Sequence, residues 1–208
     1  MFSNKDLRKL IIPLVIEQLL AVTIGMADTV MVSSCGEAAV SGISLVDSIN
    51  FLLITLFSSL ATGGAVIASQ YIGRGDHKSA SLAAKQLFYA SLALSAVLGI
   101  IAVFFRKPVL NMVFGSIEAD VMAHAQIYFL LSAISYPFLA VYNAGAALFR
   151  SMGDSRTTML ISILMNTINI VGNAILIYGF QMAAAGAATA SLVSRAVGAI
   201  IITVLLLN

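Results

Sequence analysis

Two acidic side chains, Glu17 and Asp28, lie in one long apolar stretch near the N-terminus. They are 11 positions apart, so an α-helix would place them on one face, about 16 Å apart along its axis. An ionised group in hydrocarbon costs at least about 2.5 to 3.5 kcal/mol and is expected to face a cavity or a partner. This face is therefore a candidate lining for a pathway that carries ions or polar solutes.

The ionisable residues of the apolar stretches differ in what they suggest. Asp28, removed from water, is predicted to exchange a proton or a sodium ion rather than to serve only as a structural hydrogen-bond acceptor. Glu17 lies nearer the chain end and either lines the pathway or reaches interfacial water. Asp47 lies close to the start of the second stretch, which favours a helix-capping or interfacial role. Arg195, in the last stretch, either neutralises a carboxylate or extends to the interface.

A stripe of amides marks the fifth apolar stretch. Asn166, Asn169 and Asn173 follow one another at spacings of three and four, which is one face of a helix. Such a stripe should face other helices, where its amides either hold helices together or coordinate a cation through their oxygens. Spacing alone favours the first interpretation.

The remaining reactive residue types are sparse and separated. The chain has one cysteine, Cys35, and two histidines, His77 and His124, too few for the usual soft metal sites or an internal disulfide. We find no nucleophile and base pair, phosphate-binding glycine loop or metal motif. The sequence therefore predicts no enzyme and no cofactor apart from a coupling ion.

Composition indicates the elements that position these residues. Of the 208 residues 60% are hydrophobic and 10% charged, and the mean hydropathy is +1.02, which excludes a water-soluble domain. The net charge of +2 is small and scattered, which argues against nucleic acid. We predict an all-α integral membrane protein, residues 1–208 forming one bundle of six transmembrane helices. The expected spans are 10–33, 43–72, 86–105, 121–147, 157–179 and 183–207.

Basic residues predict the orientation, because cytoplasmic loops retain an excess of Lys and Arg. With the N-terminus inside, eight basic residues fall on the inner side and two on the outer side. We therefore expect a multi-pass protein of the cell membrane with both termini in the cytoplasm. The inner residues are Lys5, Arg8, Lys9, Arg74, Lys78, Lys85, Arg150 and Arg156, and the outer ones are Arg106 and Lys107.

Several segments together resemble the N-terminal half of a multidrug and toxic compound extrusion (MATE) transporter. The resemblance runs from the first span to the last, in order and at the right separations. The segments are the opening span with Pro13, Gln18 and ADTVMV around Asp28; ATGGAVIASQYIGRGD (61–76); LFRSMGDSRTTM (148–159); NIVGNAILIYG (169–179); and GAATASLVSR (186–195).

This resemblance implies one six-helix lobe of a twelve-helix exporter. It further implies cation-coupled antiport, in which entry of sodium or protons drives export of bulky, often cationic, amphiphilic compounds. Asp28 matches the coupling-ion carboxylate of the family, and the neighbours carried over are Asn169, Asn173 and Thr189. A sodium ion would bind at Asp28, Asn169 and Asn173. Further candidates to line the cavity are Glu17, Gln18, Asn166 and Arg195.

One carried-over position departs from the family, and three functions stay open. The position of Asn173 is an aspartate in one branch of the family, so this chain has one carboxylate fewer there. Besides the antiporter lobe, the alternatives are a flippase for a lipid-linked substrate and a non-transporting membrane fragment. An exporter would need a second six-helix lobe or a second copy in a homodimer. We favour a fragment whose second lobe is missing.

Overall fold

The computed structural model describes residues 4–207, and in that range its regular elements are all helices. Six of them are long and apolar enough to cross a membrane, as the sequence predicted. The expected spans lie within these helices, the fifth running across a helix and its continuation. The bounds are α1 Asn4–Ser33, α2 Glu37–Gly73, α3 His77–Phe114, α4 Ala119–Ser151, α5 Ser155–Asn173 with the π-helix η1 Ala174–Gly179, and α6 Ala183–Leu207.

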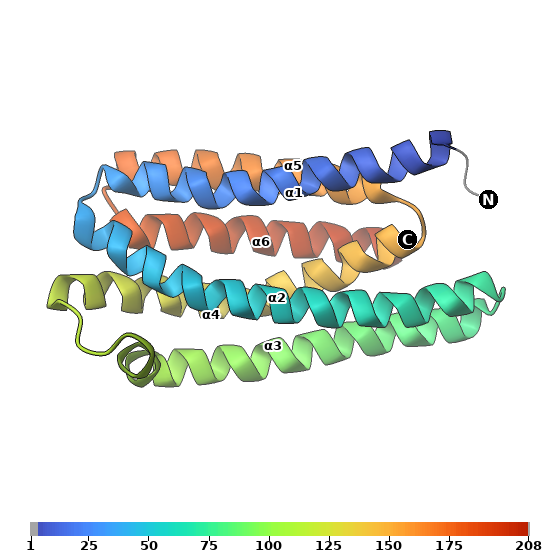
Figure 1. The fold of residues 1–208 in the computed structure, drawn as a ribbon, viewed down its shortest axis with the longest axis horizontal. Coiled ribbons are helices and arrows are strands. Elements are labelled where there is room, and N and C mark those ends of the chain that lie inside the picture. Colours follow the sequence, from blue (N-terminus) through green and yellow to red (C-terminus); the bar gives the residue numbers. More distant parts are fainter. Residues whose placement is uncertain (1–3, 208) are drawn as a thin grey trace.

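The helices run along one common direction and form two groups (Figure 1). α1 packs against α5, and α5 against α6, whereas α2, α3 and α4 pack on one another. Contact between α4 and α6 joins the groups. The start of α1 and the end of α6 lie at the same end of the bundle (Figure 1). We call this the terminal end; it also holds the turns at 74–76 and 152–154, and the far end holds those at 34–36, 115–118 and 180–182.

The two turns at the terminal end use the same short motif, a glycine followed by an aspartate. The glycines have φ of +74° and +86°, a conformation that other residues adopt only with strain. Asp76 and Asp154 then cap the next helix, accepting hydrogen bonds from the N–H groups of Ser79 and Thr157 at 3.0 and 3.1 Å. Hydrogen bonds from the same two residues lower the pKa of both carboxyls. The caps define where α3 and α5 begin.

Helix α3 changes direction near the far end. Phe105 has non-helical dihedral angles, and Pro108 follows three residues later. A proline lacks the N–H that would bond to the carbonyl four residues earlier, so the helix bends there. The expected span ends at this bend, and the last part of α3 turns away from the direction of the bundle (Figure 1).

Small residues allow the close packing of α4, the most buried of the six helices. Its buried face includes Ala133, Ala140 and Ala144. Opposite it on α2, a Cβ atom added to Gly42 would lie 2.9 Å from the backbone N of Ala125 and the backbone O of Val121. Because both neighbours are backbone atoms, neither can move aside without displacing α4. The small residues therefore bring helix backbones together, as they do in many membrane proteins.

Replacing Gly42 by alanine should therefore destabilise the bundle. We expect a loss of about 1 to 3 kcal/mol, the usual range for overpacking, measured as unfolding in a denaturing detergent. Gly63 lies in the same helix with open space around its Cβ position, which makes Gly63→Ala the matched control. Equal stability of the two variants would contradict this account of the α2–α4 contact.

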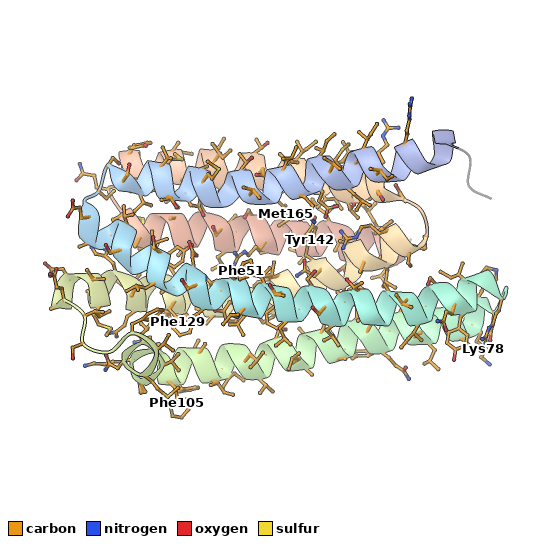
Figure 2. All side chains as sticks on the ribbon, in the orientation of Figure 1. Phe51, Lys78, Phe105, Phe129, Tyr142 and Met165 are labelled. Carbon is orange, nitrogen blue, oxygen red and sulfur yellow. The ribbon has the colours of Figure 1, made fainter. Side chains whose placement is uncertain are left out.

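The outward faces of the bundle are apolar. Phe51, Tyr89 and Phe104 are each more than two thirds exposed, as expected where hydrocarbon replaces water. Lys78 lies at the terminal end and Phe105, next to the basic pair of the far end, at the opposite end (Figure 2). The bundle thus separates the two sets of basic residues that the sequence assigned to opposite sides.

The single cysteine offers a direct test of orientation. Cys35 is exposed in the turn between α1 and α2, at the far end, which we expect to face outward. A membrane-impermeant maleimide should label Cys35 in intact cells, and Cys35→Ser should abolish that signal. Labelling that requires permeabilised cells would reverse the orientation.

Candidate functional site

Asp28 is buried where α1 meets α5 and α6, with only 4% of its surface exposed. The side-chain amide of Asn173 donates a hydrogen bond to one carboxylate oxygen. The hydroxyl of Ser191 donates to the other at 3.3 Å. A carboxylate removed from water requires such partners, so these two bonds tie α1 to both neighbouring helices.

Asn169, one helical turn before Asn173 on α5, belongs to the same group of contacts. Its side-chain nitrogen donates to the hydroxyl oxygen of Ser191 at 2.9 Å, and its oxygen lies 3.5 Å from the nitrogen of Asn173. Both asparagines are fully buried. We call Asp28, Asn169, Asn173 and Ser191 the carboxylate cluster.

The amide oxygen of Asn173 is buried without a hydrogen-bond partner among the described residues. Together with Asp28, Asn169 and Ser191, it gives the cluster carboxylate, amide and hydroxyl oxygens around one point of the bundle. Oxygen ligands of this kind suit hard cations. The donor set therefore fits a sodium ion, and the carboxylate also fits a proton.

The local sequence explains how α5 and α6 come close enough to build the cluster. A Cβ added to Gly172 would lie 2.9 Å from that of Ala190, so the glycine permits a contact that a larger residue would block. Immediately after Asn173 the helix widens into the π-helix η1. π-helical turns interrupt regular helical bonding and occur often at functional sites.

The residue that α6 contributes differs from the one carried over from the family. Thr189 donates its hydroxyl to the backbone oxygen of Ala185 in its own helix, whereas Ser191 contacts Asp28. Two positions along an α-helix rotate the side chain by about 200°, so Thr189 and Ser191 face in opposite directions. Arg195, one turn beyond Ser191, was the sequence signal that could have identified this face.

Asp47 does not cap a helix, which corrects one of the two roles that the sequence suggested. Helix α2 begins at Glu37, so Asp47 lies well inside it. Its carboxylate accepts hydrogen bonds from the hydroxyl of Tyr128 at 3.1 Å and the amide of Asn50 at 3.3 Å. The sequence expectation failed because polar residues at 37–44 hid the true start of the helix.

A buried network extends from Asp47 across the contact between α2 and α4. Asn50 accepts from the hydroxyl of Tyr136 at 2.8 Å and donates to Ser132 at 3.4 Å. Tyrosine and serine are also common in the helices of soluble proteins, so the presence of these residue types did not reveal this network in the sequence.

Arg195 forms no close ion pair among the described residues. Its guanidinium donates to the hydroxyl of Ser135 on α4 at 2.7 Å. It nevertheless lies within electrostatic reach of both Asp28 and Asp47. It therefore supplies one positive charge that acts on both carboxylates.

The other cavity candidates lie outside the carboxylate cluster. Glu17 pairs with Arg150 at 2.9 Å and accepts from Thr158 at 3.0 Å. Gln18 is on the exposed side of α1. Asn166 donates to the backbone oxygen of Ser162 in its own helix. Of the asparagine stripe, Asn169 and Asn173 bond to other helices.

Comparison with known proteins identifies the family. The family model MatE matches residues 13–175, which is most of the chain. The chain belongs to the MatE family. The resemblance found in the sequence is thereby confirmed.

Relatives of this MatE chain are transporters rather than enzymes. It is 32% identical over 205 residues to the uncharacterized transporter YisQ of Bacillus subtilis (strain 168), covering 93% of the chain and 43% of YisQ. It is 30% identical over 209 residues to the probable multidrug resistance protein NorM of Thermotoga maritima, covering 96% of the chain and 44% of NorM.

Solved structures show the same fold for the MatE chain. An outward-facing multidrug resistance MATE family transporter of the MOP superfamily superposes with a TM-score of 0.90 at 24% identity, covering 97% of the chain and 44% of that protein. The chain thus has the fold of one lobe and spans less than half the length of these relatives. With its six apolar helices, it is a multi-pass membrane protein.

A matched pair of substitutions on α6 tests the cluster. Ser191→Ala removes a donor to Asp28 and leaves the nitrogen of Asn169 without its acceptor, so we expect a loss of about 1 kcal/mol in unfolding. Thr189→Ala should change stability little, because the lost bond lies within one helix. Unfolding of both variants in a denaturing detergent measures the difference. A larger loss from Thr189→Ala would refute the assigned face of α6.

Proposed function

We propose that this chain is one half of a cation-coupled antiporter that exports bulky, often cationic, amphiphilic compounds from the cell. The observation that carries the proposal is the buried carboxylate cluster, which holds Asp28 between three helices by groups that a cation can replace. Membership of the MatE family supports transport, and the NorM relative, named a probable multidrug resistance protein, supports the substrate class.

The charges around the cluster suit one monovalent cation. With Asp28, Asp47 and Arg195 all ionised, this part of the bundle carries a net charge of −1. A buried charge without compensation is costly, so one proton or one sodium ion is favoured. The sequence and the donor set admit either ion.

Ion binding competes with the bonds that tie the helices together. A cation on Asp28 displaces the amide N–H of Asn173, and the amide can then turn its oxygen toward the ion. The bond from α5 to α1 is thereby exchanged for bonds to the ion. Because the ion binds one arrangement of the helices better than the other, it shifts the balance between two states of the lobe. This differential affinity couples ion entry to export.

A second six-helix half would complete the transporter. The relatives are more than twice as long as the chain, which supports a partner of similar size. Because the start of α1 and the end of α6 lie at one end, a second copy in the same orientation, related by an axis along the membrane normal, would also fit. We propose that the terminal end faces the cytoplasm, in agreement with its basic residues.

Asp28→Asn should abolish efflux driven by a gradient. We expect proteoliposomes containing the chain to lose sodium- or proton-driven ethidium transport, since the amide cannot exchange a cation. Imposing each gradient separately identifies the ion. Asp120→Asn is the matched control, because Asp120 is exposed in the first turn of α4.

Transport by the Asp28→Asn variant at the unaltered rate would reject the proposed role of Asp28. If the unaltered chain moves no ethidium without a second half, hydrogen exchange in α1, α5 and α6 still tests ion binding. Sodium or acid should protect the segments around Asp28, Asn173 and Ser191 in the unaltered chain and not in Asp28→Asn. Identical responses would reject the ion site.

A further inference from the structure

The second carboxylate of α1 is buried as well, toward the terminal end. Only 7% of Glu17 is exposed. Arg150, in the last turn of α4, pairs with one oxygen at 2.9 Å, and the hydroxyl of Thr158 donates to the other at 3.0 Å. The side chain of Arg150 remains 27% exposed. Glu17 is thus enclosed by the bundle, whereas its partner Arg150 reaches the surface of the bundle.

Buried polar atoms without partners occur on α4 and α5, the two helices that contact Glu17. The hydroxyls of Ser155 and Tyr142 and the amide oxygen of Asn166 have no hydrogen-bond partner among the described residues, and all three residues are more than nine-tenths buried. Tyr142 lies beside Ser162 and within electrostatic reach of Glu17 and Arg150. Unsatisfied buried groups are costly, and clusters of them commonly hold water.

These groups continue along α5 as far as the carboxylate cluster. The polar residues of α5 recur every three or four positions, which is one face of the helix. α1 packs along α5, and its two carboxylates contact the two ends of this face. The polar face spans about 22 Å. Its residues are Thr158, Ser162, Asn166, Asn169 and Asn173.

We propose that Glu17 is a second binding station for the coupling cation, reached from Asp28 along a hydrated polar face of α5. This inference rests on the proposed function and adds the route by which the ion leaves. Arg150 of α4 and Thr158 of α5 contact Glu17. Tyr142 of α4 lies within electrostatic reach of it.

Arg150 acts as the cation with which the travelling ion competes. When no ion is present, the guanidinium neutralises Glu17. A proton or sodium ion that binds the carboxylate replaces Arg150, whose side chain can turn into water at the bundle surface. The bond between α1 and α4 is then broken, and the ion can leave at the terminal end. Rebinding of Arg150 closes the route.

Cysteine labelling tests the route independently of transport. In a Cys35→Ser background, Ser162→Cys places a thiol on the polar face, and Ser95→Cys places one at a buried serine of α3, away from the route. Both serines are at least nine-tenths buried. In nanodiscs, a cationic, water-soluble thiol reagent should label Ser162→Cys at least tenfold faster than Ser95→Cys. Equal rates, whether fast or slow, would overturn the hydrated face.

The role of Glu17 is tested by the ion dependence of that labelling. Raising sodium, or lowering pH, should increase the rate several-fold, after division by the rate of exposed Cys35 in the unaltered chain under the same conditions. Glu17→Gln with Arg150→Gln should remove the dependence. The double change leaves no unpaired charge buried, so the bundle should fold. No dependence in Ser162→Cys with Glu17 and Arg150 intact, or persistence of the dependence in the double variant, would overturn the second binding station.

Asp28→Asn separates this inference from the proposed function. The variant should keep the ion dependence of labelling at Ser162→Cys, because the ion acts at Glu17. Loss of the dependence would assign the ion to Asp28 alone and overturn the second station. Unchanged efflux by Asp28→Asn would instead reject the proposed function while leaving the labelling result intact.

Discussion

The position of α1 depends on the pairing of its two buried carboxylates. Among the described side chains, α1 contributes only Val32 to the buried apolar core. Asp28 and Glu17 bind partners on α4, α5 and α6 instead. A buried charge without a partner is costly, so these bonds determine where α1 lies. A helix held by charge can be released by a cation, whereas one held by apolar packing cannot.

The rest of the bundle is built in the opposite way. α2, α3 and α4 meet through small residues and backbone contacts, as at Gly42, and at Gly99, where an added Cβ would lie 3.0 Å from the backbone oxygen of Ala133. Close-packed backbones resist gradual deformation. The lobe therefore joins tightly packed helices to α1, whose contacts depend on buried charge.

The polar residues show how far sequence reasoning extended into the site. Burial of Asp28 and the amide stripe followed from apolar surroundings and helical spacing, because both signals are local. The choice between Thr189 and Ser191 did not, since it depends on the rotation of α6 about its axis. The capping role predicted for Asp47 was wrong because hydropathy placed the start of α2 too late. Polar residues at the end of a helix have the hydropathy of a loop.

The sequence by itself determined the class of protein and the number and order of its helices, because burial in hydrocarbon demands about 20 apolar residues per span. It also identified the carboxylates that needed partners, from the cost of burying charge. Only the tertiary structure decided which partners they have. Pairing of Asp28 with Asn173 and of Glu17 with Arg150 joins residues far apart in the chain, and such contacts depend on how helices rotate and pack against one another.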